Sequence, residues 1–280
     1  MKIHVLDCGY IDISKDLLFG GGNARTDLPK AAAAPESKRV TLPVHAFLVE
    51  HPTGLFLIDT GWGRAISPKG VYDRAAVLKE LPVHLAAMYR PYVPEGMDVV
   101  EQLGSMGIKP SDLTAVIITH FDPDHISGLR SLGGASRIIV PEDEAYWSVR
   151  TKYRLRQPRL WEAPGVGKFE RMFYKGRPLG PVGKAVELTE DGSIMYVSLP
   201  GHTDGQAGVV LKDKGGYAVV AGDAAVSAEN WETMRAPGYA ANNGIQKRTL
   251  EWLAKTAADP ECKAVLCSHD KDIEPKVIEI

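Results

Sequence analysis

The stretch His120-Phe121-Asp122-Pro123-Asp124-His125 gathers imidazole and carboxylate groups in one short segment. It follows Ala115-Val116-Ile117-Ile118-Thr119, an apolar, β-branched run that is typical of a buried strand. Imidazole and carboxylate together suit zinc, manganese or iron, and the lack of a thiolate argues against a structural zinc site. The stretch therefore indicates a metal site at a strand end, although a polar loop with incidental histidines would explain it if it stood alone.

Further candidate ligands also stand directly after apolar runs, beside glycine or another small residue that lets the backbone approach closely. They are His202 after residues 194–198, Asp223 after residues 217–220, and His269 after residues 264–266. The repetition of ligand types at successive strand ends favours a metal site over an incidental polar loop.

The order of these motifs, with Leu57-Ile58-Asp59-Thr60-Gly61 upstream, resembles the metallo-β-lactamase superfamily of metal-dependent hydrolases. That family carries His-x-His-x-Asp-His, followed by single His, Asp and His ligands. The resemblance covers essentially the whole chain and is strongest to the lactonase branch, which includes quorum-signal and pyridoxolactone hydrolases. It implies an α/β fold, an αββα sandwich of two mixed β-sheets flanked by helices. The metal ligands that it implies are His120, Asp122, Asp124, His125, His202, Asp223 and His269.

The resemblance also implies two divalent ions as cofactors. One ion would be held by His120, Asp122 and His202, and the other by Asp124, His125 and His269, with Asp223 as the bridge. Two ions ~3.5–4 Å apart can activate a shared hydroxide for attack on a substrate, and Asp124 would act as the catalytic residue that steers its proton. Zinc is the first choice. Manganese or iron is the alternative, because Asp122 stands where the family has a second histidine.

Other positions depart from the family pattern in ways that bear on the substrate. Val226 stands three residues after the bridging aspartate, where quorum-signal lactonases carry a tyrosine that assists the substrate carbonyl. Gln206 stands where relatives often have another histidine. Tyr174 and Tyr196 are the first candidates to replace the missing hydroxyl donor.

The sequence therefore predicts a metal-dependent hydrolase of a small carbonyl ester, with a lactone as the first choice. An alternative is phosphodiester or phosphonate hydrolysis on the same dinuclear site. A non-enzymatic alternative is a metal- or ligand-binding member whose site has drifted, and it is motivated by Asp122, Gln206 and Val226.

Composition agrees with a single enzyme domain over residues 1–280. The chain is 44% hydrophobic and 24% charged, with a formal net charge of −2 that offers no global attraction for nucleic acid or an anionic membrane. We expect a small-molecule substrate, no nucleic-acid or membrane partner, no signal peptide, and a cytoplasmic location in which Cys8, Cys262 and Cys267 stay reduced. A β-hairpin is predicted over residues 44–58, with helices over 98–106 and 244–258.

Residues 150–177 form the strongest shift in composition. Lysine, arginine and aromatic residues are interleaved there, against only Glu162 and Glu170 as acidic residues. Basic groups among aromatics can bind nucleic acid, but the overall charge disfavours this. We expect an insertion that acts as a lid or as a homodimer contact, with recognition of an anionic small molecule as a further alternative.

Overall fold

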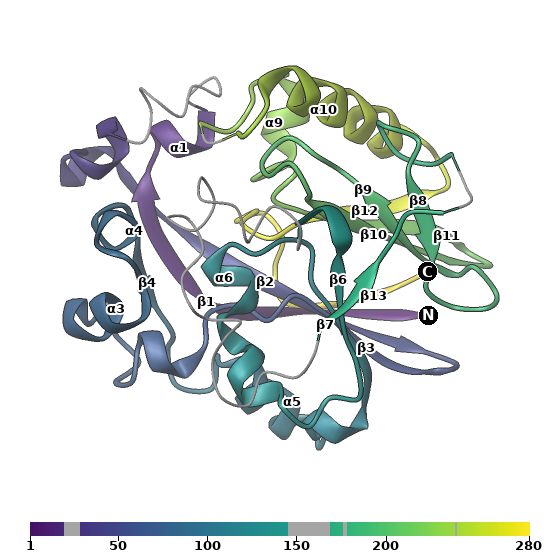
Figure 1. Cartoon of the computed structure of the whole chain (residues 1–280), viewed down its shortest axis with the longest axis horizontal. Helices are drawn as coiled ribbons and strands as arrows, with labels where there is room; N and C mark the ends of the chain where they lie inside the picture. The colour runs from purple at the N-terminus through teal and green to yellow at the C-terminus, as the bar shows by residue number, and fades with distance from the viewer. Residues whose placement is uncertain (20–28, 145–168, 176–177, 239) are drawn as a thin grey trace.

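A computed structural model of the protein describes residues 1–19, 29–144, 169–175, 178–238 and 240–280. Two mixed β-sheets pack face to face, with helices on their outer faces (Figure 1). This is the αββα sandwich expected from the sequence. The N- and C-termini lie side by side, joined by a hydrogen bond from the Ile280 amide to the Met1 carbonyl.

The first sheet combines antiparallel and parallel pairing. Its order is β13 (Val277–Glu279), β1 (Lys2–Ser14), β2 (Arg39–His51), β3 (Gly54–Ile58), β5 (Leu113–Ile117), β6 (Ile138–Pro141) and β7 (Phe169–Met172), while β4 (Arg90–Tyr92) also pairs with β1. Pairing is antiparallel from β13 to β3 and parallel from β3 to β7. The hairpin predicted over residues 44–58 is confirmed, because β2 pairs with β3 in the register Glu50 to Leu55.

The second sheet is smaller. Its order is β12 (Cys262–Cys267), β11 (Gly216–Gly222), β10 (Ala207–Asp213), β9 (Ile194–Ser198) and β8 (Ala185–Glu187). Only the β11–β12 pair is parallel.

The main core fills the space between the sheets. On β2, Phe47 and Val49 point into this core, where they join Tyr196 and Val209 of the second sheet. The alternate residue Leu48 points to the opposite face and packs under a helix. Because both faces of β2 are covered, its sequence is a continuous apolar run and does not alternate with polar residues.

The outer layers are amphipathic helices with well-formed N-termini. On the first sheet, α5 (Val99–Ser105) packs through Leu103, and Asp98 with Glu101 forms a capping box at its start. On the second sheet, α9 (Ala228–Glu232) and α10 (Asn243–Ala257) pack together with its outer face (Figure 1). The two helices predicted over residues 98–106 and 244–258 are thus confirmed.

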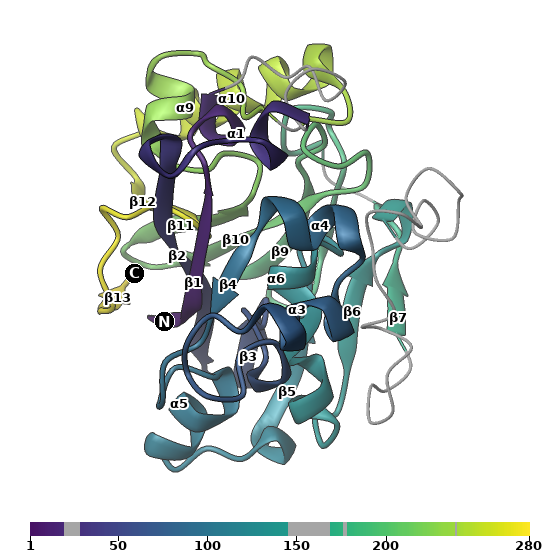
Figure 2. The same cartoon turned by 90° about the vertical axis from the view of Figure 1, so that its left-hand side faces the viewer.

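Shorter helices complete the chain. They are α1 (Asp16–Phe19), η1 (Glu36–Lys38), η2 (Arg64–Ile66), α3 (Arg74–Glu80), α4 (Val83–Met88), η3 (Pro110–Asp112), α6 (Pro123–Ile126) and η4 (Ser127–Leu132). A separate apolar cluster joins α3 and α4 to the C-terminal end of β1 and the N-terminal end of β2 (Figure 2). No helix within the described ranges is long and apolar enough to cross a membrane.

The basic segment predicted as a lid is only partly described. Residues 150–168 and 176–177 lie outside the described residues. Residues 169–172 form the edge strand β7, so this part of the segment belongs to the first sheet and is not lid. Phe169 packs on Phe121 with ring centroids 5.3 Å apart, and Arg171 pairs with Glu142.

The carboxyl ends of β3, β5, β9, β11 and β12 meet at one edge of the sandwich. Two backbone hydrogen bonds join the sheets there, from Ala207 N to Thr119 O at 2.9 Å and from His45 N to Ser268 O at 2.8 Å. Every candidate ligand follows one of these strands, because loops after strand ends are where such sheets place binding groups.

The inter-sheet core should dominate stability. We predict that Phe47→Ala lowers the free energy of unfolding by ~3–5 kcal/mol, because it leaves a cavity at a fully buried position. Urea denaturation in the presence of a chelator, which keeps metal binding out of the comparison, measures this loss. Leu78→Ala, at a side chain that is 42% exposed on α3, is the control and should have a small effect. Equal losses in the two variants would contradict this account of the core.

Candidate metal centre

The candidate ligands come from loops that follow four different strands. His120, Asp122, Asp124 and His125 follow β5, and α6 begins among them with Pro123 in its first turn. His202 follows β9, Asp223 follows β11, and His269 follows β12. All of these side chains are buried.

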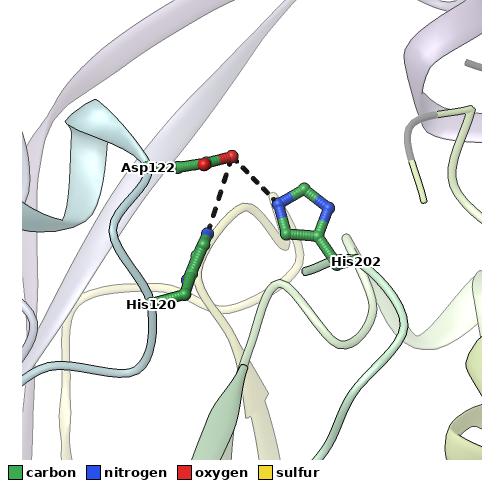
Figure 3. A group of neighbouring side chains, drawn as sticks. All are labelled: His120, Asp122 and His202. Atoms are coloured by element: carbon green, nitrogen blue, oxygen red, sulfur yellow. Dashed lines mark hydrogen bonds and ion pairs between the residues drawn. The ribbon is translucent and has the colours of Figure 1, made fainter. Parts of the chain in front are cut away.

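These side chains converge into three overlapping groups, in each of which the ligand atoms lie within 4.8 Å of one another. The groups are His120, Asp122 and His202; His120, His125 and Asp223; and Asp124, His125 and His269. Figure 3 shows the first group, with the Asp122 carboxylate turned toward both imidazoles. Asp122 therefore lies within the cluster and does not turn away from it.

Asp223 occupies the centre of the cluster. Its Oδ1 lies 3.3 Å from Nε2 of His125, and its Oδ2 lies 3.3 Å from Nε2 of His269 and 3.7 Å from Nε2 of His202. The preceding Gly222 has φ +56, and a Cβ there would come within 2.9 Å of the Thr119 hydroxyl. Glycine thus permits the tight turn that aims Asp223 between the two halves of the cluster.

A carboxylate outside the cluster orients its histidines. Asp59, fully buried after β3, accepts hydrogen bonds from the Thr119 amide and hydroxyl and from Nδ1 of His125, each at 2.8 Å. Because the Thr119 hydroxyl donates its proton to Asp59, its oxygen accepts one from Nδ1 of His120 at 3.0 Å. Nδ1 of His269 donates to the Pro43 carbonyl at 2.9 Å. These three histidines are therefore anchored through Nδ1 and present Nε2 to the cluster.

Nε2 of His120 tests whether the cluster suits a metal ion. This atom is buried and has no hydrogen-bond partner among the described residues. Its nearest carboxylate oxygens belong to Asp122 and Asp223, at 3.8 and 4.0 Å. A buried lone pair without a partner is costly. The surrounding imidazole nitrogens and carboxylate oxygens are the donor atoms that a divalent transition metal takes. The residues present fit such an ion.

The electrostatics of the cluster agree with this fit. Burial, together with the nearby His125 imidazole, holds the pKa of His120 well below its ordinary value, so its lone pair is free of a proton. Burial also opposes protonation of His269, but Asp223 and Asp124 raise the pKa of His269 to about 10. Although burial would raise the pKa of Asp223, His269 and His125 hold it well below the ordinary value. Buried carboxylates here depend on nearby positive charge, which a dication also provides.

A small cavity of about 50 Å³ gives access to the cluster. It is lined by Asp122, Asp124, His202, Asp223 and His269 together with Ile11, Ile13, Leu17, Tyr89, Val226 and Pro237. Val226 and His269 also line a larger neighbouring cavity of about 510 Å³. Val226 therefore stands where the metal-facing cavity meets a larger one.

The substitute hydroxyl donors expected from the sequence need correction. Tyr196 lies in the core between the sheets and donates its hydroxyl to the Ile118 carbonyl, so it cannot serve the cavity. Tyr174 is not among the lining residues either and packs against Tyr196. Tyr89 does line the cavity, and nothing local in the sequence distinguishes it because its position depends on how α4 packs.

The remaining positions singled out in the sequence have packing roles. Gln206 is buried and donates to the Ala221 carbonyl, so it supports the strand that leads to Asp223. Burial raises the pKa of Cys267, which lies in the apolar cluster beneath α10. All three cysteines are free thiols, as expected.

Comparisons with known proteins agree with this geometry. Residues 39–269 match the sequence profile of the Metallo-beta-lactamase superfamily. The chain is 27% identical over 241 residues to the N-acyl homoserine lactonase AttM of Azorhizobium caulinodans, covering 84% of each protein. Its fold matches a solved N-acyl homoserine lactone hydrolase with N-hexanoyl-L-homoserine at the catalytic metal centre (TM-score 0.75, 18% identity, 99% of this chain and 98% of the other). It also matches AidC, a dizinc quorum-quenching lactonase (TM-score 0.66, 17% identity, 96% and 87%).

Asp59 was not predicted to have a role in the site, and its contacts can be tested. We predict that Asp59→Asn weakens metal binding by ~10–100-fold, because the neutral amide holds the Nδ1 protons of the ligands less well. Competition with a chromophoric chelator measures this affinity. Asp98→Asn is the matched control, since Asp98 is also buried but caps α5 away from the cluster. Equal metal affinities in the two variants would rule out the orienting role.

Proposed function

This chain belongs to the metallo-beta-lactamase superfamily and is a metal-dependent hydrolase, and we propose that it opens lactones at a site with two metal ions. The observation that carries the proposal is the convergence of the buried ligand groups around Asp223. His120, Asp122 and His202 would hold one ion and Asp124, His125 and His269 the other, with Asp223 between them. This division coincides with the groups that the side chains form.

Zinc is the proposed metal. Imidazole nitrogens outnumber carboxylates among the proposed ligands, which suits zinc, while the extra carboxylate of Asp122 keeps manganese or iron as alternatives. When bound, such ions supply a hydroxide nucleophile near neutral pH and polarise the oxygen of a carbonyl.

The residues around the proposed ions would position the attacking water and exclude other water from the substrate. Asp124 lines the metal-facing cavity, with Oδ2 3.3 Å from Nε2 of His269, and is proposed to hold the proton of the attacking water. Asp223 keeps the two halves of the cluster at a fixed separation. Apolar side chains of Ile11, Ile13 and Leu17 surround the remaining space and exclude water from the reacting carbonyl.

The space directly at the ligands favours a neutral carbonyl ester over a phosphodiester. Among the described residues that line the metal-facing cavity, none is lysine or arginine, the groups that usually neutralise a phosphate, whereas Lys15 and Lys271 line the adjoining larger cavity. A lactone is neutral and compact, and the relative that shares 27% identity is an N-acyl homoserine lactonase. The non-catalytic alternative loses its main support, because Asp122 lies among the ligands and Gln206 does not replace one.

Other expectations stay as predictions. We propose that residues 1–280 act as one domain on a small-molecule substrate in the cytoplasm, without nucleic acid or membrane as a partner. The part of residues 150–177 beyond β7 is still proposed to form a lid or a homodimer contact.

The reaction class is tested with a substrate panel. The metal-loaded protein should hydrolyse lactones, and a chromogenic phosphodiester should react far more slowly. Removal of metal by a chelator should abolish lactone opening, and added zinc should restore it. Faster hydrolysis of the phosphodiester, or lactone opening that survives complete metal removal, would refute the proposal.

Val226 gives a sharper test of the substrate. Removing one donor to a developing oxyanion typically costs ~10²–10³ in rate, so acyl homoserine lactones should be slow substrates. Val226→Tyr should raise their kcat, because the adjoining cavity of about 510 Å³ leaves room for the ring. Val226→Phe adds the same bulk without a hydroxyl and is the control. Fast turnover of acyl homoserine lactones by the unmodified protein, or equal gains in kcat in both variants, would contradict this prediction. The hydroxyl donor to the carbonyl would then be another residue, and Tyr89 would be the first to test by mutation.

A further inference from the structure

Glu144 is a buried carboxylate that touches two ligand loops at once. Its Oε1 accepts the amide proton of Phe121 at 3.1 Å, and its Oε2 accepts the hydroxyl proton of Thr203 at 2.8 Å. Phe121 separates His120 from Asp122, and Thr203 directly follows His202. One side chain that is 1% exposed therefore joins the two loops that carry the first ligand group. Asp124 and His125 of the other group lie further along the first loop, in α6, where Thr60 and Asp59 hold His125 independently of Glu144.

The backbone of Glu144 packs tightly against the loop that follows His202, so a shift of Glu144 would also move that loop. A Cβ on Gly205, in the loop that follows His202, would come within 2.1 Å of the Glu144 amide nitrogen. The backbones are therefore in direct contact and cannot shift apart without losing the hydrogen bonds. A buried carboxylate is expensive unless its oxygens accept good hydrogen bonds, so the carboxylate and the two loops constrain each other.

His45 has the corresponding position on the other half of the cluster. Its ring Nε2 donates to the Asp270 carbonyl at 3.1 Å, and its backbone amide donates to the Ser268 carbonyl at 2.8 Å. Its Nδ1 lies 2.7 Å from Oδ1 of Asp7. These contacts fix the residues on both sides of His269, whose own Nδ1 is anchored on Pro43.

We propose that the two halves of the metal cluster are supported separately, by Glu144 for the group His120, Asp122 and His202, and by His45 with Asp7 for the loop of His269. Glu144 and His45 are positioning residues, since neither belongs to a ligand group. The inference rests on the proposed two-metal function. Its consequence is that losing one support weakens one ion and spares the other.

The experiment measures metal content and affinity without any substrate. Zinc-loaded protein is analysed by atomic emission, and stepwise release of zinc to a chromophoric chelator gives the affinity of each site. Wild type should hold two ions. Glu144→Ala and His45→Ala should each weaken one site by ~10–100-fold and leave the other unchanged.

A double-mutant cycle assigns each loss to its half. In a His202→Ala background, which removes a ligand of the first group, Glu144→Ala should add little further loss. His45→Ala in that background should weaken the remaining ion by the same ~10–100-fold. The conservative variants Glu144→Gln and His45→Gln retain hydrogen-bonding groups and should recover most of the affinity. Glu142→Ala is the matched control, because Glu142 precedes Glu144 closely but pairs with Arg171.

The outcomes separate this inference from the proposed function. A wild-type protein that takes up fewer than two ions overturns both. Two ions in wild type, with unchanged or equally weakened sites in Glu144→Ala and His45→Ala, overturn the separate supports alone. If Glu144→Ala fails to fold, Thr203→Val removes one partner of the same carboxylate and should weaken the same site. An unchanged first site in Thr203→Val contradicts the proposal.

Discussion

The structure depends on the burial of several carboxylates beside imidazoles in one small space. The carboxylates of Asp122, Asp124 and Asp223 each lie 3.1–3.3 Å from an imidazole nitrogen of the cluster, and buried carboxylates are unstable unless positive charge lies beside them. Although burial opposes their protonation, Asp223 and neighbouring carboxylates raise the pKa of His125 and His269, so positive charge is favoured beside these carboxylates. A pair of divalent ions would provide it more strongly and would also satisfy the lone pair of His120.

The sandwich holds this arrangement in place because the ligands follow the ends of four rigid strands, β5, β9, β11 and β12. The sheets meet at the edge where β3, β5, β9, β11 and β12 end, and hydrogen bonds such as that from Ala207 to Thr119 join them there. Asp59, Glu144 and His45, which lie outside the ligand groups, then hold the ligand loops through hydrogen bonds. The cost of burying these polar groups is offset by apolar packing elsewhere, mainly between the two sheets.

The candidate ligands could be proposed from the sequence because their signal is local. They follow four apolar runs, and two of the three groups in the structure contain the same residues as the two ion sites that the family resemblance implies. The sandwich itself could not be derived from periodicity, since β2 is apolar on both faces and does not alternate. The supporting residues were missed for another reason. The contacts of Asp59 with Thr119 and of Glu144 with Thr203 join distant parts of the chain. Asp59 lies in a recognisable motif, but that motif does not show which side chains it contacts, and no local pattern marks Glu144. The same limit explains why Tyr196 was wrongly considered as a donor, and why residues 169–172 were placed in an insertion that acts as a lid or a homodimer contact and were not recognised as β7.

The most direct test of the central claim is a crystal structure of the zinc-loaded protein with anomalous diffraction measured at the zinc edge. We predict two anomalous peaks ~3.5–4 Å apart, one beside His120, Asp122 and His202 and the other beside Asp124, His125 and His269, with Asp223 between them. A single peak, or peaks that lie away from these side chains in zinc-saturated crystals, would contradict it.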